Sequence, residues 1–178
     1  MKQLSQPAET IDVPKPIQTA IEVTPIPISS IVTPTKFELE KFSVTSAGFD
    51  SGKTTLNAEG VKALDLLVRK ILGKLVMDDR FQDRVINIKV VGHTDSTGIS
   101  AATQKREGYK TNQELSEKRA TNVLTHLQKG LSTLSERVTY ADPVGQGDTW
   151  CKENNKPKNS AECRRVDVSI EDITPAAQ

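Results

Sequence analysis

The sequence predicts an α/β (α+β sandwich) domain with the element order βαβαββ, in which two helices pack on one face of a mixed four-stranded sheet. Two stretches place apolar residues three and four positions apart, which is typical of amphipathic helices. Shorter stretches rich in β-branched residues lie before, between and after them, as strands require. Elements that alternate in this way favour parallel strands joined by right-handed crossovers.

Residues 1–35 are predicted to be a linker or tether, because they hold six of the nine prolines of the chain. Proline-rich segments favour extended conformations and act as semi-rigid spacers. The alternative is that the isoleucine and valine side chains of this segment lie along the domain surface. The domain itself is expected over residues 36–172, followed by a tail at 173–178.

The first strand is expected over residues 36–44, where apolar side chains alternate irregularly. The turn-prone segment 49–52 separates it from a long helix that begins behind Asn57, a residue type favoured at the N-cap. The apolar stripe of this helix must cover a sheet, because a lone helix cannot bury it. The stripe consists of Val61, Leu64, Val68, Ile71, Leu72 and Leu75.

The second strand, over residues 85–91, is dominated by valine and isoleucine and ends at Gly92. A polar connection then runs through about Lys110 to a second amphipathic helix, which ends near Gly130. The apolar residues of this helix are Leu115, Ala120, Val123, Leu124 and Leu127. The last two strands are expected at Val138–Val144 and Val166–Ile170.

The charge balance argues against polyanion binding, since 24 Lys and Arg face 23 Asp and Glu for a net charge of +1. We therefore expect no nucleic-acid partner. No apolar run reaches the length of a membrane-spanning helix, and the first residues do not form a basic segment followed by an apolar one. Membrane association is expected only through a region, such as an export signal or anchor, that preceded Met1.

Two cysteines, Cys151 and Cys163, lie in a polar stretch rich in Asn, Lys and Pro. A disulfide that closes this loop is the favoured interpretation, and two free thiols are the alternative. Zinc is not expected, because neither His93 nor His126 has finger-like spacing from the cysteines. A disulfide implies an oxidising compartment.

The densest functional signal is the polar loop 92–98, directly after the second predicted strand, and the segment 112–120 at the front of the second helix. Asn112 and Arg119 are seven positions apart and therefore share one helical face. Simpler interpretations exist: Asp95 as a turn residue that bonds its own backbone, and Arg119 as a surface residue that pairs with a nearby glutamate.

These two segments, together with residues 49–53, 144–147 and 164–166, resemble the sequence pattern of the OmpA-like C-terminal domain family. The resemblance runs from Phe49 to about Ile170. It implies non-covalent binding of peptidoglycan, with no catalysis and no cofactor. The bound group in that family is the diaminopimelate of the stem peptide, whose free end carries an ammonium and a carboxylate on one carbon.

By this resemblance, Asp95 would pair with the ammonium and Arg119 with the carboxylate. The planar guanidinium of arginine bonds a carboxylate with two parallel N–H groups, which lysine cannot do. Thr97 and Asn112 would add hydrogen bonds, and Arg164 or Arg165 a further positive charge. The chain departs from the family pattern in two places. The connection 99–111 is longer than usual, and Gly52 stands where many relatives carry a polar residue.

The leading hypothesis is an envelope protein, of outer-membrane or lipoprotein type, that this domain anchors to the cell wall in the periplasm of a Gram-negative bacterium. The alternative is a dimerising stator or secretion-apparatus scaffold of the same fold with weak or no wall binding. A hydrolase acting through Asp95, His93 and Glu117 is disfavoured, because the sequence lacks a zinc ligand set, a strained nucleophile and a paired-carboxylate signature.

Overall fold

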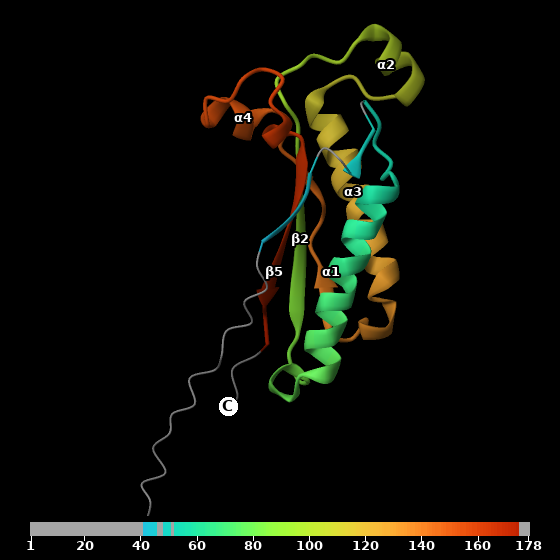
Figure 1. Ribbon diagram of the computed structural model, residues 1–178, viewed down its shortest axis with the longest axis vertical. Helices are drawn as coiled ribbons and strands as arrows, with labels where there is room; N and C mark the ends of the chain where they lie inside the picture. The colour runs from blue at the N-terminus through green and yellow to red at the C-terminus, as the bar shows by residue number, and fades with distance from the viewer. Residues whose placement is uncertain (1–40, 46–47, 51, 175–178) are drawn as a thin grey trace, which may run out of the picture. The chain divides into compact units, whose positions relative to one another are not determined.

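The computed structural model describes residues 41–45, 48–50 and 52–174 (Figure 1). The predicted linker, the first part of the predicted strand 36–44 and the end of the predicted tail lie outside these residues. The strands are β1 (Phe42–Val44), β2 (Ile86–His93), β3 (Val138–Tyr140), β4 (Val144–Gly145) and β5 (Arg165–Asp172). The helices are α1 (Ala58–Met77), α2 (Ala101–Glu107), α3 (Asn112–Gly130) and α4 (Thr149–Glu153). Short 3-10 helices form at Asp79–Phe81, Ser132–Leu134 and Ala161–Cys163.

The strands form one mixed sheet, which confirms the predicted fold class. Their order is β1-β5-β2-β3, and β4 also pairs with β2. The β1/β5 and β2/β5 pairs are antiparallel, whereas β3 and β4 run parallel to β2. The predicted strand 138–144 is thus two strands, β3 and β4, so the sheet has five strands in four lateral positions. The break at residues 141–143 contains Pro143, which has no N–H to donate to a neighbouring strand.

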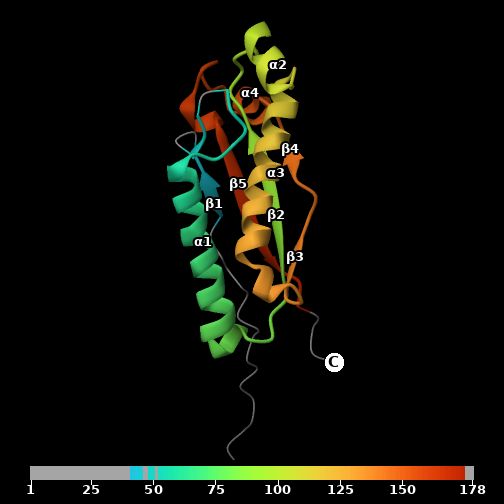
Figure 2. The same ribbon diagram turned by 90° about the vertical axis from the view of Figure 1, so that its right-hand side faces the viewer.

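Helices α1 and α3 lie side by side on one face of this sheet (Figures 1 and 2). The side chain of Asn57 caps α1 as predicted, since its Oδ1 accepts hydrogen bonds from the backbone N–H groups of Glu59 and Gly60, both at 3.0 Å. The predicted stripe of α1 is buried except for Val61, which is exposed, and Leu72, which is half-buried. No helix in the described part of the chain combines the length and apolarity needed to cross a membrane.

The core lies between these helices and alternate residues of the two central strands. Ile86, Ile88 and Val90 of β2 are almost fully buried, while their neighbours in sequence are half-buried. Val166 and Val168 of β5 are also fully buried, and the intervening residues again are not. Because side chains alternate between the two faces of a strand, one face of β2 and β5 packs against the helices and the other does not.

Two glycines let α3 approach the ends of β2 and β4. Gly92 and Gly145 are paired in the parallel β2/β4 register. A Cβ added at Gly92 would lie 2.0 Å from the carbonyl oxygen of Ser116, and one added at Gly145 would lie 2.5 Å from the N–H nitrogen of Glu117. The first half of α3 therefore rests directly on strand backbone, beside the loop that follows β2.

Helices α2 and α4 form where the sequence predicts irregular connections. They have 7 and 5 residues, too few to show a recurring apolar stripe. Local capping signals define α2 instead: the Ser100 side chain accepts a hydrogen bond from the Thr103 N–H at 3.2 Å, and Gly108 ends the helix in the left-handed conformation, with φ of 73°.

Replacement of Gly92 by alanine is expected to destabilise the domain by about 2 kcal/mol or more, because the new methyl group would overlap α3 backbone that cannot rotate away. The free energy of unfolding in urea measures this effect. The matched control is Gly73→Ala in α1, where an added Cβ meets no atom within 4 Å. That change should stabilise the domain by up to about 1 kcal/mol, and equal effects of the two substitutions would contradict the close packing.

Candidate functional site

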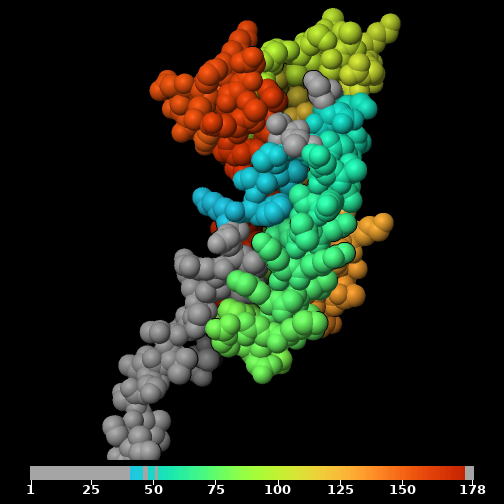
Figure 3. Space-filling view, in the orientation of Figure 1, coloured from blue at the N-terminus to red at the C-terminus, as the bar shows by residue number. Residues whose placement is uncertain are grey.

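A cavity of about 580 Å³ opens at the end of the domain where β2 stops. Figures 1 and 3 show the segments that surround it, namely α2, the turn before α1 and the loop that carries α4, gathered at this end. The volume is typical of small-ligand sites. The lining residues come from four separate segments and are Phe49, Asp50, Gly52, Thr94, Asp95, Thr97, Gly98, Ile99, Ser100, Thr103, Asn112, Leu115, Arg119, Asn159 and Arg164.

Arg119 is the buried cation of this cavity. It is 5% exposed, its Nε donates a hydrogen bond to the carbonyl oxygen of Lys53 at 2.9 Å, and its guanidinium carbon lies 5.0 Å from the centre of the Phe49 ring. Within the described residues its terminal nitrogens bond no protein group and no carboxylate pairs with it. Burial lowers the pKa of Arg119 from its ordinary value, and the nearby Tyr109 and Asp95 oppose this. A buried guanidinium with two open donor groups is suited to an anion.

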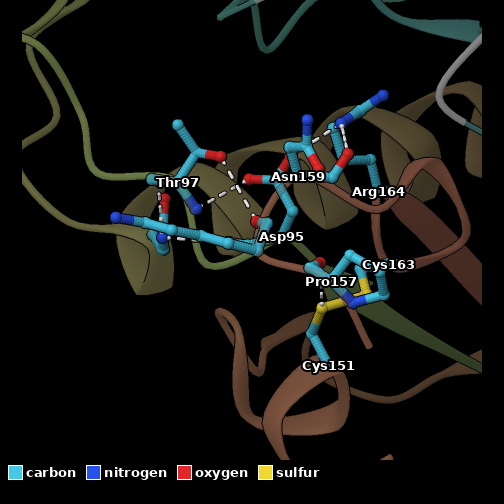
Figure 4. Close-up of polar contacts among 9 residues, drawn as sticks. Asp95, Thr97, Cys151, Pro157, Asn159, Cys163 and Arg164 are labelled. Atoms are coloured by element: carbon cyan, nitrogen blue, oxygen red, sulfur yellow. Dashed lines mark hydrogen bonds and ion pairs between the residues drawn. A yellow bond between two sulfur atoms is a disulfide. The ribbon is translucent and has the colours of Figure 1, made fainter. Parts of the chain in front are cut away.

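Asp95 is a buried acidic residue of the cavity, and 8% of its surface is exposed. Its Oδ1 accepts a hydrogen bond from the Thr97 N–H at 3.0 Å, so the aspartate does shape its own turn. Its Oδ2 accepts from Nη1 of Arg164 at 2.7 Å (Figure 4). Each carboxylate oxygen has two acceptor positions, so both oxygens can take a further donor.

Asn112 and Thr97 connect the Asp95 loop to the rest of the site. The Asn112 Nδ2 donates to the carbonyl oxygens of Asp95 at 3.1 Å and Thr97 at 3.0 Å. The Thr97 hydroxyl donates to the carbonyl oxygen of Lys158 at 3.3 Å. Asn112 is the first residue of α3, since Thr111 is the N-cap. The front of this helix is thereby tied to the loop after β2.

The two candidate arginines, Arg164 just before β5 and Arg165 at its start, have different environments. Arg164 lines the cavity, whereas Arg165 lies outside it. The Arg165 Nε bonds the Asp167 carboxylate at 3.0 Å, and its guanidinium stacks 3.9 Å above the Trp150 ring. The contacts of Arg165 with Asp167 and Trp150 therefore hold its guanidinium outside the cavity that Arg164 lines. Of the six predicted site residues, the structure brings together Asp95, Thr97, Asn112, Arg119 and Arg164.

A family model for the OmpA family matches residues 48–165. This chain belongs to the OmpA family. Among solved structures, this OmpA-family chain is similar to a putative MotB-like protein from Desulfovibrio vulgaris, with 26% identity and a TM-score of 0.54 over 78% of this chain and 75% of that chain. A search of the curated proteins finds no significant match.

The periplasmic domain of Helicobacter pylori MotB is a second structural neighbour of the OmpA-family chain. The two share 20% identity with a TM-score of 0.52, over 75% of this chain and 76% of that chain. At this identity the likeness shows the fold alone. Both comparisons agree with the predicted architecture.

Several cavity residues of this OmpA-family domain were not predicted from the sequence. Ile99, Ser100 and Thr103 come from the long connection, whose first part forms a wall of the cavity. Tyr109 does not line the cavity, but it is fully buried, and its hydroxyl donates a hydrogen bond to the carbonyl oxygen of the lining residue Gly52. The unusual length of the connection was the available signal, but its polar composition gave no indication of which residues face inward.

The predicted disulfide joins Cys151 to Cys163 (Figure 4). His93 does not reach the cavity: its Nε2 lies 3.2 Å from the Asp167 carboxylate, on the side where Arg165 lies. Within residues 41–45, 48–50 and 52–174, no group of three His, Cys, Asp or Glu residues is arranged to hold a metal ion.

Asp167 contacts Ser43, His93 and Arg165, none of which lines the cavity. Burial alone would raise the pKa of this carboxyl, but hydrogen bonds from His93 and Ser43, with the charge and hydrogen bond of Arg165, lower it from 3.8 to about 2. A lowered carboxyl pKa stabilises the folded state at pH values above 3.8, and this stabilisation disappears as the pH falls toward 2. Its size is about 2 kcal/mol.

We therefore expect the difference in unfolding free energy between the wild type and Asp167→Asn to be constant from pH 5 to 7 and to shrink by about 2 kcal/mol as the pH falls from 4 toward 2. Urea denaturation at each pH measures it. A difference that does not change over this pH range would contradict the assigned contacts.

Proposed function

We propose that this domain binds peptidoglycan non-covalently through the diaminopimelate of the stem peptide, and thereby anchors an envelope protein to the cell wall. The observation that carries the proposal is a buried arginine that lines the cavity beside a carboxylate and whose terminal nitrogens bond none of the described residues. Membership of the OmpA family supports binding of the cell wall. Diaminopimelate is the ligand that the resemblance to this family implies, and the charges of the cavity are compatible with it.

The charges of the cavity match an amino-acid head group. Asp50 is paired with Lys53 at 3.2 Å and Asp95 with Arg164 at 2.7 Å, so Arg119 is the charge without a partner carboxylate among the described residues. A ligand carboxylate would bond both terminal nitrogens of Arg119. An ammonium on the same ligand carbon would reach Asp95, which has acceptor positions left beside Arg164.

Binding of one such head group is expected to be reversible. A charge-assisted hydrogen bond contributes about 1.5–3 kcal/mol, and ordering of the ligand offsets part of this gain. Affinity for an isolated stem peptide is therefore expected in roughly the micromolar to millimolar range. Stable attachment to the wall would arise from many copies that bind at once.

A periplasmic location fits this function. The disulfide is compatible with an oxidising compartment, and the similar domain of Helicobacter pylori MotB is itself described as periplasmic. Attachment to the outer membrane, by a lipid or another anchor, belongs to the same proposal and would lie outside the described residues.

Asp95→Asn and Arg119→Gln are each expected to weaken cosedimentation with diaminopimelate-containing sacculi by about 10- to 100-fold, because each removes one charge-assisted interaction. Asparagine has nearly the shape of aspartate, and glutamine keeps the first carbons of the arginine side chain with a polar end, so far-ultraviolet circular dichroism should not change. The matched control is Arg80→Ala, which removes an exposed arginine paired with Asp78 at 2.7 Å, away from the cavity. Retention of wild-type binding by either site variant would show that the ligand uses another surface.

Sacculi that carry lysine in place of diaminopimelate should bind at least about tenfold more weakly, since lysine lacks the carboxylate that Arg119 is proposed to hold. A pulldown with the two wall types, matched for mass and cross-linking, measures the ratio. Equal retention would leave wall binding possible but would remove the head-group specificity.

The dimerising scaffold is the alternative function. The structural neighbours of MotB type share 26% and 20% identity with this chain, and at 20% the likeness shows the fold alone. Sedimentation velocity separates the two functions. Concentration-dependent dimerisation without sacculus binding would favour the scaffold, whereas a monomer that cosediments with sacculi would favour the anchor.

A further inference from the structure

The disulfide closes a loop that forms one wall of the cavity. Asn159, inside the loop, and Arg164, directly after Cys163, both line the cavity. We propose that the Cys151–Cys163 disulfide is a positioning element of the binding site, and not only a stabilising cross-link. The inference rests on the proposed function, because it concerns the affinity of the same cavity for an amino-acid head group.

Two adjacent carbonyl groups of this loop accept hydrogen bonds from groups of the site. One bonds the turn that follows Asp95, and the other bonds Arg164 (Figure 4). The carbonyl oxygen of Lys158 accepts hydrogen bonds from the Ser96 N–H at 2.9 Å and from the Thr97 hydroxyl at 3.3 Å. The carbonyl oxygen of Asn159 accepts from Nη1 of Arg164 at 3.0 Å, and the same nitrogen bonds Asp95 at 2.7 Å. The loop therefore fixes both the turn that carries Asp95 and the arginine that faces it.

The loop has few other means of keeping this position. Its residues 152–162 are all exposed or half-exposed, whereas Cys151 and Cys163 are fully buried. Backbone hydrogen bonds within the loop define its shape. The Lys156 N–H donates to the Cys151 carbonyl oxygen at 3.0 Å, and the Ser160 N–H donates to the Pro157 carbonyl oxygen at 2.9 Å. They do not attach it to the core. Without buried apolar side chains, the covalent link between its ends restricts where its carbonyls lie.

Loss of the cross-link is therefore expected to change the positions of the site residues while the sheet stays folded. The Lys158 and Asn159 carbonyls would sample several positions, and Arg164 would lose one of the two acceptors that orient its Nη1. Each ligand molecule would then have to order these groups on binding, which lowers affinity. The domain should consequently bind its ligand well only after the cysteines have been oxidised.

The test compares the wild type with the Cys151→Ala/Cys163→Ala variant by titration calorimetry with free meso-diaminopimelate. Alanine leaves no unsatisfied donor in the buried cysteine positions. We expect about tenfold weaker binding by the variant. The matched control is Val138→Ala, which removes buried methyl groups at the far end of β2 from the cavity and should lower thermal stability without changing affinity. Wild-type affinity in the cysteine variant would overturn the proposal.

A second comparison separates positioning from general destabilisation. In an Arg164→Gln background, removal of the cysteines should weaken binding by only about twofold, because one of the groups that the loop orients is absent. The same tenfold loss in both backgrounds would mean that the disulfide does not act through Arg164, and would overturn that part of the inference.

A ligand-free measurement keeps the two proposals distinguishable. Amide hydrogen exchange of Ser96 should accelerate on removal of the cysteines while exchange of Ile88 and Val90 in β2 does not. If the oxidised wild type fails to bind diaminopimelate, the proposed function fails whatever the exchange shows. Unchanged exchange at Ser96 would overturn the positioning role even if the wild type binds.

Discussion

The site depends on the contact between the first half of α3 and the ends of β2 and β4. Only glycine fits at positions 92 and 145, because α3 backbone occupies the places where a Cβ would lie. This contact fixes the helix against the strand end, and Arg119 follows the contact residue Ser116 by about one helical turn. The loop that begins at the end of β2 carries Asp95. One packing constraint therefore sets the separation of the two charged groups.

Burial of Arg119 is the main electrostatic feature that this arrangement creates. A guanidinium removed from water costs free energy unless its donors and charge are satisfied. The Lys53 carbonyl and the Phe49 ring satisfy part of this requirement, and the terminal nitrogens of Arg119, which lines the cavity, bond none of the described residues. The Asp95–Arg164 pair is neutral overall, so in the proposed function Arg119 would take a ligand carboxylate and Asp95 an ammonium next to it. The disulfide loop holds that pair in place through its carbonyls.

Much of this could be predicted from the sequence, and the exceptions have physical reasons. Helices α1 and α3 and strands β2 and β5 have apolar patterns that indicate burial, and a disulfide is the favoured interpretation of two cysteines in a polar loop. Helices α2 and α4 are too short for such a pattern. The direction of Arg165 away from the cavity depends on its contacts with Trp150 and Asp167. The Asp95–Arg164 pair joins residues 69 positions apart. Neither is visible in a local sequence pattern.

The most direct test of ligand binding at this cavity is the position of diaminopimelate in a complex with this domain, from a crystal structure or from intermolecular contacts in NMR spectra. We expect a ligand carboxylate bonded to both terminal nitrogens of Arg119 and an ammonium within hydrogen-bond distance of Asp95. A ligand on another surface, or one whose carboxylate avoids Arg119, would contradict this expectation.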